Sequence, residues 1–197
     1  IYISTTGIGE KLTDFLISGH QAKPGDAVLI SGSMGDHGTA ILSKRENMSF
    51  LTEIQSDTAA LNGLVEKILK VAPDIHVLRD PTRGGLAATL NEIAHQSNVG
   101  IFLNEDQIPV KPSVAAACEF LGLDPLFVAN EGKLIVICEK KEAQAVLEVM
   151  RTHPLGQEAA IIGEVTEENA GCVEMQTILG GRRSVDWLNG EQLPRIC

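Results

Sequence analysis

Apolar residues form short runs along the chain, and glycine, proline and polar residues separate these runs. The run at 27–30 follows a Pro-Gly turn signal at 24–25 and is typical of a buried strand. A short strand is also predicted at 77–78. Further strands are predicted at 134–138, 161–165 and 172–175.

Other segments repeat apolar residues every three or four positions, which predicts helices with one buried face. These segments are 61–69, a stretch that starts at Leu86, 114–121 and 143–150. Pro73 lies beyond the first of them and is expected to stop that helix. Because helices and strands alternate without a fixed repeat, we expect a layered α+β domain rather than a doubly wound sheet.

The two ends of the chain differ from its middle. Residues 1–9 alternate like a strand without a nearby partner, so we expect residues 1–22 to be the last strand and linker of a missing amino-terminal domain. The main domain is then expected over 23–189, with its last element near 185–188. Residues 190–197 show no periodicity and are expected to form a flexible tail.

The chain is acidic: 16 Lys and Arg residues stand against 26 Asp and Glu residues, which gives a net charge of −10. Nucleic acid and anionic lipid are therefore disfavoured as main partners, because both require clustered basic side chains. The apolar runs are much shorter than a membrane span. We expect a soluble cytoplasmic protein that binds neither nucleic acid nor a membrane.

The four cysteines are Cys118, Cys138, Cys172 and Cys197. Their spacing predicts neither a zinc site nor a disulfide framework, so no metal ligands are assigned. The first three fall in apolar segments. Cys197 is the last residue, and a ten-residue tail could carry its thiol roughly 30 Å. It is either a swinging arm or an incidental exposed cysteine; a prenylation box does not fit, because its cysteine stands four residues from the end.

The loop at 80–85 lies between a predicted strand and a predicted helix and is a candidate phosphate site. The amides of Gly84 and Gly85 can approach an anion at the helix entrance, Arg83 can add donors and Asp80 a carboxylate. The alternative is a structural turn in which Asp80 or Thr82 caps the helix.

A second glycine-rich loop, at 32–38, does not match the P-loop pattern because no lysine follows its last glycine. His37 in this loop is a candidate acid, base or phosphate donor, or alternatively makes a local structural hydrogen bond. Glu131 precedes the predicted strand at 134–138, where partial desolvation would make it more basic and suit it to act as a general base. The same residues are equally typical of a turn.

Taken together, four motifs resemble the HypE family, the carbamoyl dehydratases of [NiFe]-hydrogenase maturation. They are GDHG at 35–38, DPTRGGL at 80–86, NEGK at 130–133 and PRIC at 194–197. The last two are the most specific, whereas the second is shared with aminoimidazole ribonucleotide synthetase and selenophosphate synthetase. The resemblance covers the whole chain and implies a PurM-like carboxy-terminal domain, with a mixed sheet flanked by helices.

The resemblance also implies a reaction. HypF places a carbamoyl group on the thiol of Cys197, ATP phosphorylates the carbamoyl oxygen, and loss of phosphate leaves a thiocyanate. The cyanide passes to the HypC–HypD complex and becomes a ligand of hydrogenase iron. The implied catalytic residues are Cys197 and Glu131, and the implied phosphate or ATP contacts are His37, Asp80, Thr82, Arg83, Gly84 and Gly85.

In this family ATP and Mg²⁺ are mostly held by the amino-terminal domain, which also forms the homodimer. We therefore expect this chain alone to hydrolyse no ATP. Two alternatives to the dehydratase stay open. The first is a non-catalytic carrier and docking domain for the carbamoylated tail. The second is part of another ATP-dependent synthetase of the same superfamily, in which Cys197 would have no task.

Overall fold

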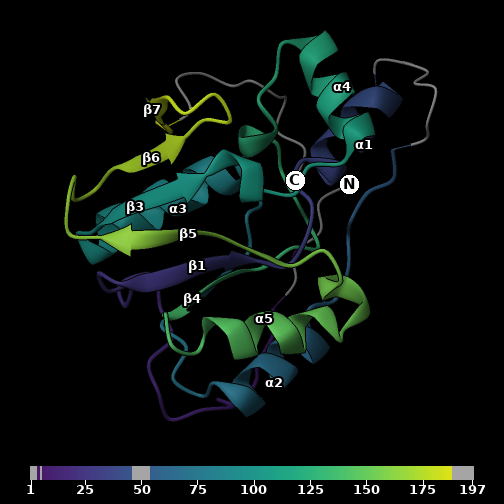
Figure 1. Cartoon of the computed structure of the whole chain (residues 1–197). Helices are drawn as coiled ribbons and strands as arrows, with labels where there is room; N and C mark the ends of the chain where they lie inside the picture. Colours follow the sequence, from purple (N-terminus) through teal and green to yellow (C-terminus); the bar gives the residue numbers. More distant parts are fainter. Residues whose placement is uncertain (1–3, 5, 46–53, 188–197) are drawn as a thin grey trace.

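The structure is a computed structural model that describes residue 4, residues 6–45 and residues 54–187. Within these residues a seven-stranded mixed sheet forms the middle layer, in the order β2-β4-β1-β5-β3-β6-β7 (Figure 1). The parallel pair in this sheet is β3 with β6, and the other pairs are antiparallel. The strands are β1 (Asp26–Ile30), β2 (Val77–Arg79), β3 (Gly100–Asn104), β4 (Ile135–Glu139), β5 (Ala160–Thr166), β6 (Val173–Gln176) and β7 (Arg182–Ser184).

Helices cover both faces of this sheet (Figure 1). α2 and α5 pack on one face, and α3 packs on the other. α1 and α4 contact each other through a smaller apolar cluster. The helices are α1 (Asp36–Arg45), α2 (Asn62–Val71), α3 (Gly85–Ser97), α4 (Pro112–Leu121) and α5 (Ala143–Arg151), with short 3-10 turns η1 (Glu105–Gln107), η2 (Pro125–Phe127) and η3 (Pro154–Gly156).

The central strand β1 shows why the sheet needs cover on both sides. Val28 and Ile30 face the core shared with α3, whereas Ala27 and Leu29 face the core shared with α2 and α5. Side chains alternate between the two faces of a strand, so a strand that is apolar at both parities must be buried on both faces. All of β1 is buried.

Strand register brings three loops to one end of the sheet. β4 pairs antiparallel with both β1 and β2, and its first residue, Ile135, lies opposite Ile30 and Arg79. The ends of β1 and β2 therefore lie beside the start of β4. The loops that follow β1 and β2 and the loop that precedes β4 are therefore neighbours, although they are distant in sequence.

The predicted α+β class is confirmed, and the predicted strands and helices agree with the structure to within a few residues. The element predicted near 185–188 is wrong in position: β7 ends at Ser184, residues 185–187 have no regular structure, and Leu188 lies outside the described residues. The strand β3 was not predicted either.

The position of β7 was missed because this strand has no apolar pattern to detect. It pairs with β6 through its backbone and carries polar, partly exposed side chains.

The chain ends are only partly described. Residues 4 and 6–9 are not in a strand, and the rest of that segment lies outside the described residues. That residues 1–22 are the last strand and linker of a missing amino-terminal domain stays a prediction. The predicted tail at 190–197, including Cys197, also lies outside them. Cys118 and Cys138 are buried, whereas Cys172 is exposed just before β6. No helix in the described parts is long and apolar enough to cross a membrane.

Candidate functional site

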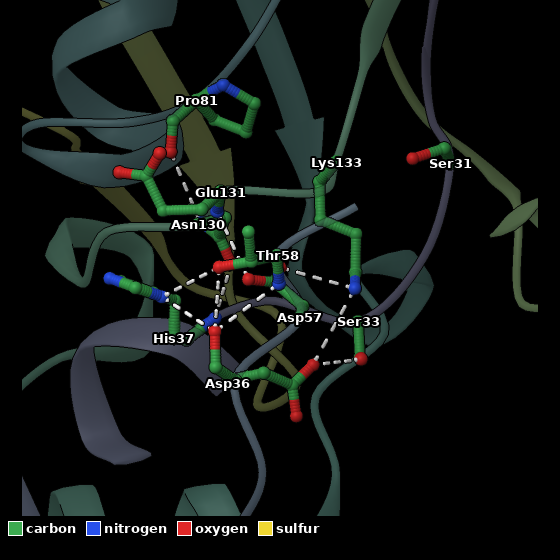
Figure 2. A network of polar contacts seen from close by, with 12 residues as sticks. Ser31, Ser33, Asp36, His37, Asp57, Thr58, Pro81, Asn130, Glu131 and Lys133 are labelled. Carbon is green, nitrogen blue, oxygen red and sulfur yellow. Dashed lines mark hydrogen bonds and ion pairs between the residues drawn. The ribbon is translucent and has the colours of Figure 1, made fainter. Parts of the chain in front are cut away.

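Three loops converge where β1 and β2 end and β4 begins. Residues 31–35 follow β1, residues 80–84 follow β2, and residues 130–134 precede β4. A fourth segment, residues 54–59, lies against them. Figure 2 shows the polar side chains of this region, among them Glu131 and His37. Two of the predicted site residues, from segments far apart in the sequence, therefore belong to one neighbourhood.

Asn130 joins two of these loops to its own. The side chain is fully buried, and its Oδ1 accepts a hydrogen bond from the backbone N–H of Gly35 at 2.8 Å. Its Nδ2 donates to the carbonyl oxygens of Pro81, at 3.2 Å, and Val128, at 3.0 Å. The backbone N–H of Asn130 also donates to Pro81 O, at 3.1 Å. Glu131, the next residue, is thereby placed beside the loop at 80–85.

Glu131 is held by the fourth segment. Its backbone N–H donates to Asp57 Oδ1 at 3.0 Å, and its side chain is half-buried. Gly132 follows, and a Cβ at this position would lie 1.8 Å from the carbonyl oxygen of Asp57. The NEGK turn thus lies flat on residues 57–59, which explains the glycine and fixes the direction in which the Glu131 side chain leaves the backbone.

Two lysines and two buried aspartates form an ionic cluster beneath this turn. Lys133 Nζ lies 3.2 Å from Asp57 Oδ2 and 3.8 Å from Asp36 Oδ2, and Lys111 Nζ lies 3.0 Å from Asp36 Oδ1. Ser33 Oγ donates a short hydrogen bond to Asp36. The aspartate side chains are 1% and 3% exposed, so each buried carboxylate has an ammonium group beside it.

His37 contacts the same segment as Glu131. His37 Nδ1 lies 2.8 Å from Ser56 Oγ and 3.4 Å from Thr58 Oγ1, and these two hydroxyls are 2.8 Å apart. Figure 2 shows the other ring nitrogen turned away from these hydroxyls. Residues 56–58 therefore contact His37 on one side and the Glu131 turn on the other.

The loop at 80–85 enters α3 through left-handed glycines. Gly84 has φ of 71° and Gly85 has φ of 62°. A Cβ on Gly85 would lie 2.5 Å from the carbonyl oxygen of Leu126, so only glycine fits there. Gly84 is the N-cap residue and no side chain caps the helix, which disagrees with the alternative that Asp80 or Thr82 is the cap.

The remaining side chains of that loop lie nearer to solvent. Asp80 is exposed and pairs with Arg79, whose Nη1 is 3.3 Å from Asp80 Oδ1. Arg83 is exposed and Thr82 is half-buried. The uncapped N terminus of α3 places the positive end of the helix dipole at this loop, where an anion is favoured. The arrangement suits phosphate.

A polar cavity of about 530 Å³ opens beside the ionic cluster. Lys111 and Lys133 line it together with the hydroxyls of Ser31, Ser56 and Thr58. Its far wall is formed by residues 154–158, which include η3. The cavity gives solvent a route to the two lysines and to the segment at 55–59.

Asp36, Asp57 and Lys133 were not assigned a role from the sequence. Asp36 and Lys133 stand inside recognised motifs, so their signal was an ionisable residue beside a glycine. Asp57 lies in the polar stretch QSDT at 55–58, which carries no pattern that distinguishes it from a surface turn. Among the described residues, no group of three His, Cys, Asp or Glu side chains could hold a metal ion.

The comparisons with known proteins agree with this fold. Residues 23–175 match the family described as AIR synthase related protein, C-terminal domain. The chain is 61% identical to carbamoyl dehydratase HypE of Cupriavidus necator and 57% identical to hydrogenase expression/formation protein HupE of Azotobacter chroococcum mcd 1, each time over its full length. It spans 56% and 58% of the length of these two relatives.

Solved structures agree as well. A crystal structure of hydrogenase maturation protein HypE superposes with a TM-score of 0.93 at 55% identity, over 96% of this chain and 61% of that one. The structure of HypE in complex with ATP has a TM-score of 0.88 at 55% identity, over 92% of this chain and 55% of that one. A structure of the HypE–HypF complex has a TM-score of 0.84 at 51% identity, over 87% of this chain and 56% of that one. On the match over residues 23–175, the chain belongs to the AIR synthase related family and carries its C-terminal domain.

Proposed function

We propose that this chain is the carboxy-terminal part of a carbamoyl dehydratase in hydrogenase maturation. The chain supplies two parts of the reaction, a general base and a phosphate-binding loop, and Cys197 carries the group that reacts. The similarity to HypE over all 197 residues supports this function. Cys197 lies outside the described residues, so its role rests on the PRIC motif.

The reaction would proceed from a carbamoyl group on the sulfur of Cys197. The carbamoyl oxygen attacks the γ-phosphorus of ATP, ADP leaves, and the nitrogen gives up one proton. The C–O bond then breaks, phosphate leaves with the oxygen, and the nitrogen gives up its second proton to form the thiocyanate. ATP is needed because an amide oxygen leaves readily only as phosphate.

Glu131 is the proposed base that takes protons from the nitrogen. The carboxylate is half-buried at the start of β4 and is held through its own backbone N–H by Asp57. The amides of Gly84 and Gly85, with Thr82, Arg83 and Asp80, would orient the phosphate and stabilise its developing charge. His37, on the other side of residues 56–58, would donate a hydrogen bond to ATP phosphate.

One observation carries this proposal. The buried side chain of Asn130 bonds to the carbonyl oxygen of Pro81 and directly precedes Glu131. A base and an anion-binding loop, 46 or more residues apart in the sequence, are thereby held next to each other. Dehydration through a phosphorylated oxygen requires both groups at the same carbamoyl unit.

ATP, HypF and the HypC–HypD complex would meet the whole protein rather than this chain alone. Relatives supply the support: HypE has been solved with ATP and with HypF. Mg²⁺ would accompany the ATP; among the described residues, no group of three His, Cys, Asp or Glu side chains could hold it. We further propose that the protein acts in the cytoplasm as a homodimer.

The test uses the full-length protein with HypF, carbamoyl phosphate and ATP, followed by intact mass spectrometry. The wild type should gain a carbamoyl group on Cys197 and then lose the mass of one water. Glu131→Gln should gain the carbamoyl group normally and lose water about 10²- to 10⁴-fold more slowly. Glu119→Gln, at an exposed position of α4, is the matched control and should behave as the wild type.

Three results would contradict the proposal. Water loss at the normal rate in Glu131→Gln would remove Glu131 from the mechanism. A wild-type protein that accepts the carbamoyl group but never loses water, with ATP and all partners present, would be a carrier and not a dehydratase. Normal cyanide delivery by a protein that lacks Cys197 would exclude the tail thiol.

A further inference from the structure

Lys133 lies between two buried carboxylates from different segments: Asp36 begins α1, and Asp57 belongs to residues 54–59. Its Nζ is 3.2 Å from Asp57 Oδ2 and 3.8 Å from Asp36 Oδ2, and only 12% of its side chain is exposed (Figure 2). The site described above has no catalytic task for this ammonium. Its burial at the centre of the converging loops nevertheless requires a reason, because lysine is rarely buried without one.

The two aspartates depend on Lys133 to different degrees. Asp36 also has Lys111 Nζ at 3.0 Å and the hydroxyl of Ser33. Asp57 Oδ2, by contrast, accepts no hydrogen bond of good geometry from the described residues. Within this part of the chain its negative charge is balanced by the Lys133 ammonium. Removal of that ammonium should therefore affect Asp57 much more than Asp36.

Asp57 links the ammonium to the proposed base. While Oδ2 faces Lys133, Oδ1 accepts the backbone N–H of Glu131 at 3.0 Å. A buried carboxylate that loses its counter-charge either takes up a proton or moves toward water. Either change weakens the hydrogen bond to the Glu131 backbone. The Glu131 turn then loses a contact that sets the direction of its side chain.

We propose that Lys133 is a positioning residue, which holds the side chain of Asp57 in place so that Asp57 can fix the backbone of Glu131. The ammonium acts through Asp57 and touches no reacting atom. This inference rests on the proposed function, because the consequence it explains is the placement of the proton-accepting carboxylate.

The experiment compares Lys133→Met, Asp57→Asn and the double variant in the full-length protein, with Lys140→Met as the control at an exposed ion pair. The carbamoylated protein receives ATP, and water loss from Cys197 is followed in a single turnover by intact mass. Lys133→Met should load the carbamoyl group normally and lose water on the order of a hundredfold more slowly.

The double variant decides between positioning and a direct role. An asparagine at position 57 keeps an oxygen that accepts the Glu131 N–H but has no charge to balance. The double variant should therefore recover most of the rate lost in Lys133→Met, and should match Asp57→Asn alone. A double variant as slow as Lys133→Met would overturn the proposal and assign the ammonium to the reacting groups. If Lys133→Met alone folds poorly, the comparison of the double variant with Asp57→Asn still tests the proposal, because neither variant has an unbalanced charge at position 57.

A second readout is independent of the reaction. Amide hydrogen exchange at Glu131 reports the hydrogen bond to Asp57, and it should be at least about tenfold faster in Lys133→Met and slow again in the double variant. Unchanged exchange in Lys133→Met would also overturn the proposal. If the wild type loses no water, the proposed function fails, whereas the exchange result still decides whether Lys133 positions this turn.

Discussion

The side-chain oxygen of Asn130 accepts a hydrogen bond from the backbone N–H of Gly35, a residue 95 positions earlier in the chain. The same side chain donates to two backbone carbonyl oxygens, of Pro81 and Val128. One buried amide therefore joins the loops that follow β1 and β2 to the loop that precedes β4. It holds the candidate site together from below, because it lies in the protein interior and not on the cavity wall.

Asn130→Ala should lower the free energy of unfolding by about 2–3 kcal/mol, because it removes the oxygen that accepts a hydrogen bond from the buried Gly35 N–H. Asn130→Asp should lower it further, since a carboxylate would face the carbonyl oxygens of Pro81 and Val128. Urea denaturation measures both. Gln107→Ala, at an exposed position, should change stability by less than about 0.5 kcal/mol. An Asn130→Ala protein as stable as the wild type would show that the loops do not depend on this amide.

Gly132→Ala should destabilise the protein by about 1–3 kcal/mol, because the new Cβ would lie 1.8 Å from the carbonyl oxygen of Asp57 and the backbone must shift. The matched control is Gly63→Ala in α2, where the Cβ meets only His153 Nε2 at 3.4 Å. Alanine favours helix over glycine, so the control should be neutral or stabilising by up to about 1 kcal/mol. The thermal unfolding midpoints of Gly132→Ala and Gly63→Ala measure this difference. Equal effects would contradict the close packing at position 132.

Asp26→Ala should be destabilising, by about 2–3 kcal/mol, because it removes the carboxylate that accepts hydrogen bonds from the buried His76 ring and from the backbone N–H of Lys23. Asp26 Oδ2 lies 2.7 Å from His76 Nδ1, and the two side chains are only 4% and 3% exposed. Lys23 completes the group: its backbone N–H donates to the same oxygen at 2.8 Å, and its Nζ is 3.1 Å from His76 Nε2.

The control for that pair is an exposed one. Lys70 and Glu66 pair at 2.7 Å in α2, with both side chains more than half exposed. Glu66→Ala should cost much less than Asp26→Ala, since water and salt screen the exposed charges. Chemical denaturation at low and high salt measures both. A similar loss for the two variants would contradict the importance of burial.

Stability should fall at alkaline pH through Cys138. Burial raises the pKa of this thiol from 9.0 to about 12, and the negative charges of Glu142, Asp26 and Glu139 add to the effect. Between pH 9 and pH 12 the unfolded chain loses this proton while the folded protein keeps it. The unfolded state then binds fewer protons, so the free energy of unfolding decreases as pH rises.

The test follows the stability difference between the wild type and Cys138→Ala. That difference should decline from pH 9 to pH 12, because the variant has no thiol to titrate at this site. Cys172→Ala, at an exposed position, is the control for removal of a thiol that is not buried. A constant difference between wild type and Cys138→Ala would mean that the buried thiol titrates as it does in the unfolded chain.

Local periodicity identified most helices and strands because burial of one or both faces leaves a repeat in the sequence. Residues 27–30 and 143–150 are examples, and both were found at nearly their observed positions. β7 left no such repeat, since its side chains are polar and its place depends on backbone hydrogen bonds to β6. Cys172 lies just before β6 and is exposed, which its apolar neighbours did not indicate.

The motifs around His37, Gly85 and Glu131 could be recognised from the sequence alone, because glycine and ionisable residues at element ends have a local signature. Their convergence could not, since it results from the antiparallel pairing of β4 with β1 and β2. The contacts of Asp57 and Lys133 depend on that pairing too, because they join residues 76 positions apart. Sequence determined which segments fold and which residues are candidates for the chemistry. Tertiary structure decided which of them meet, because strand register, and not local spacing, sets distances across the sheet.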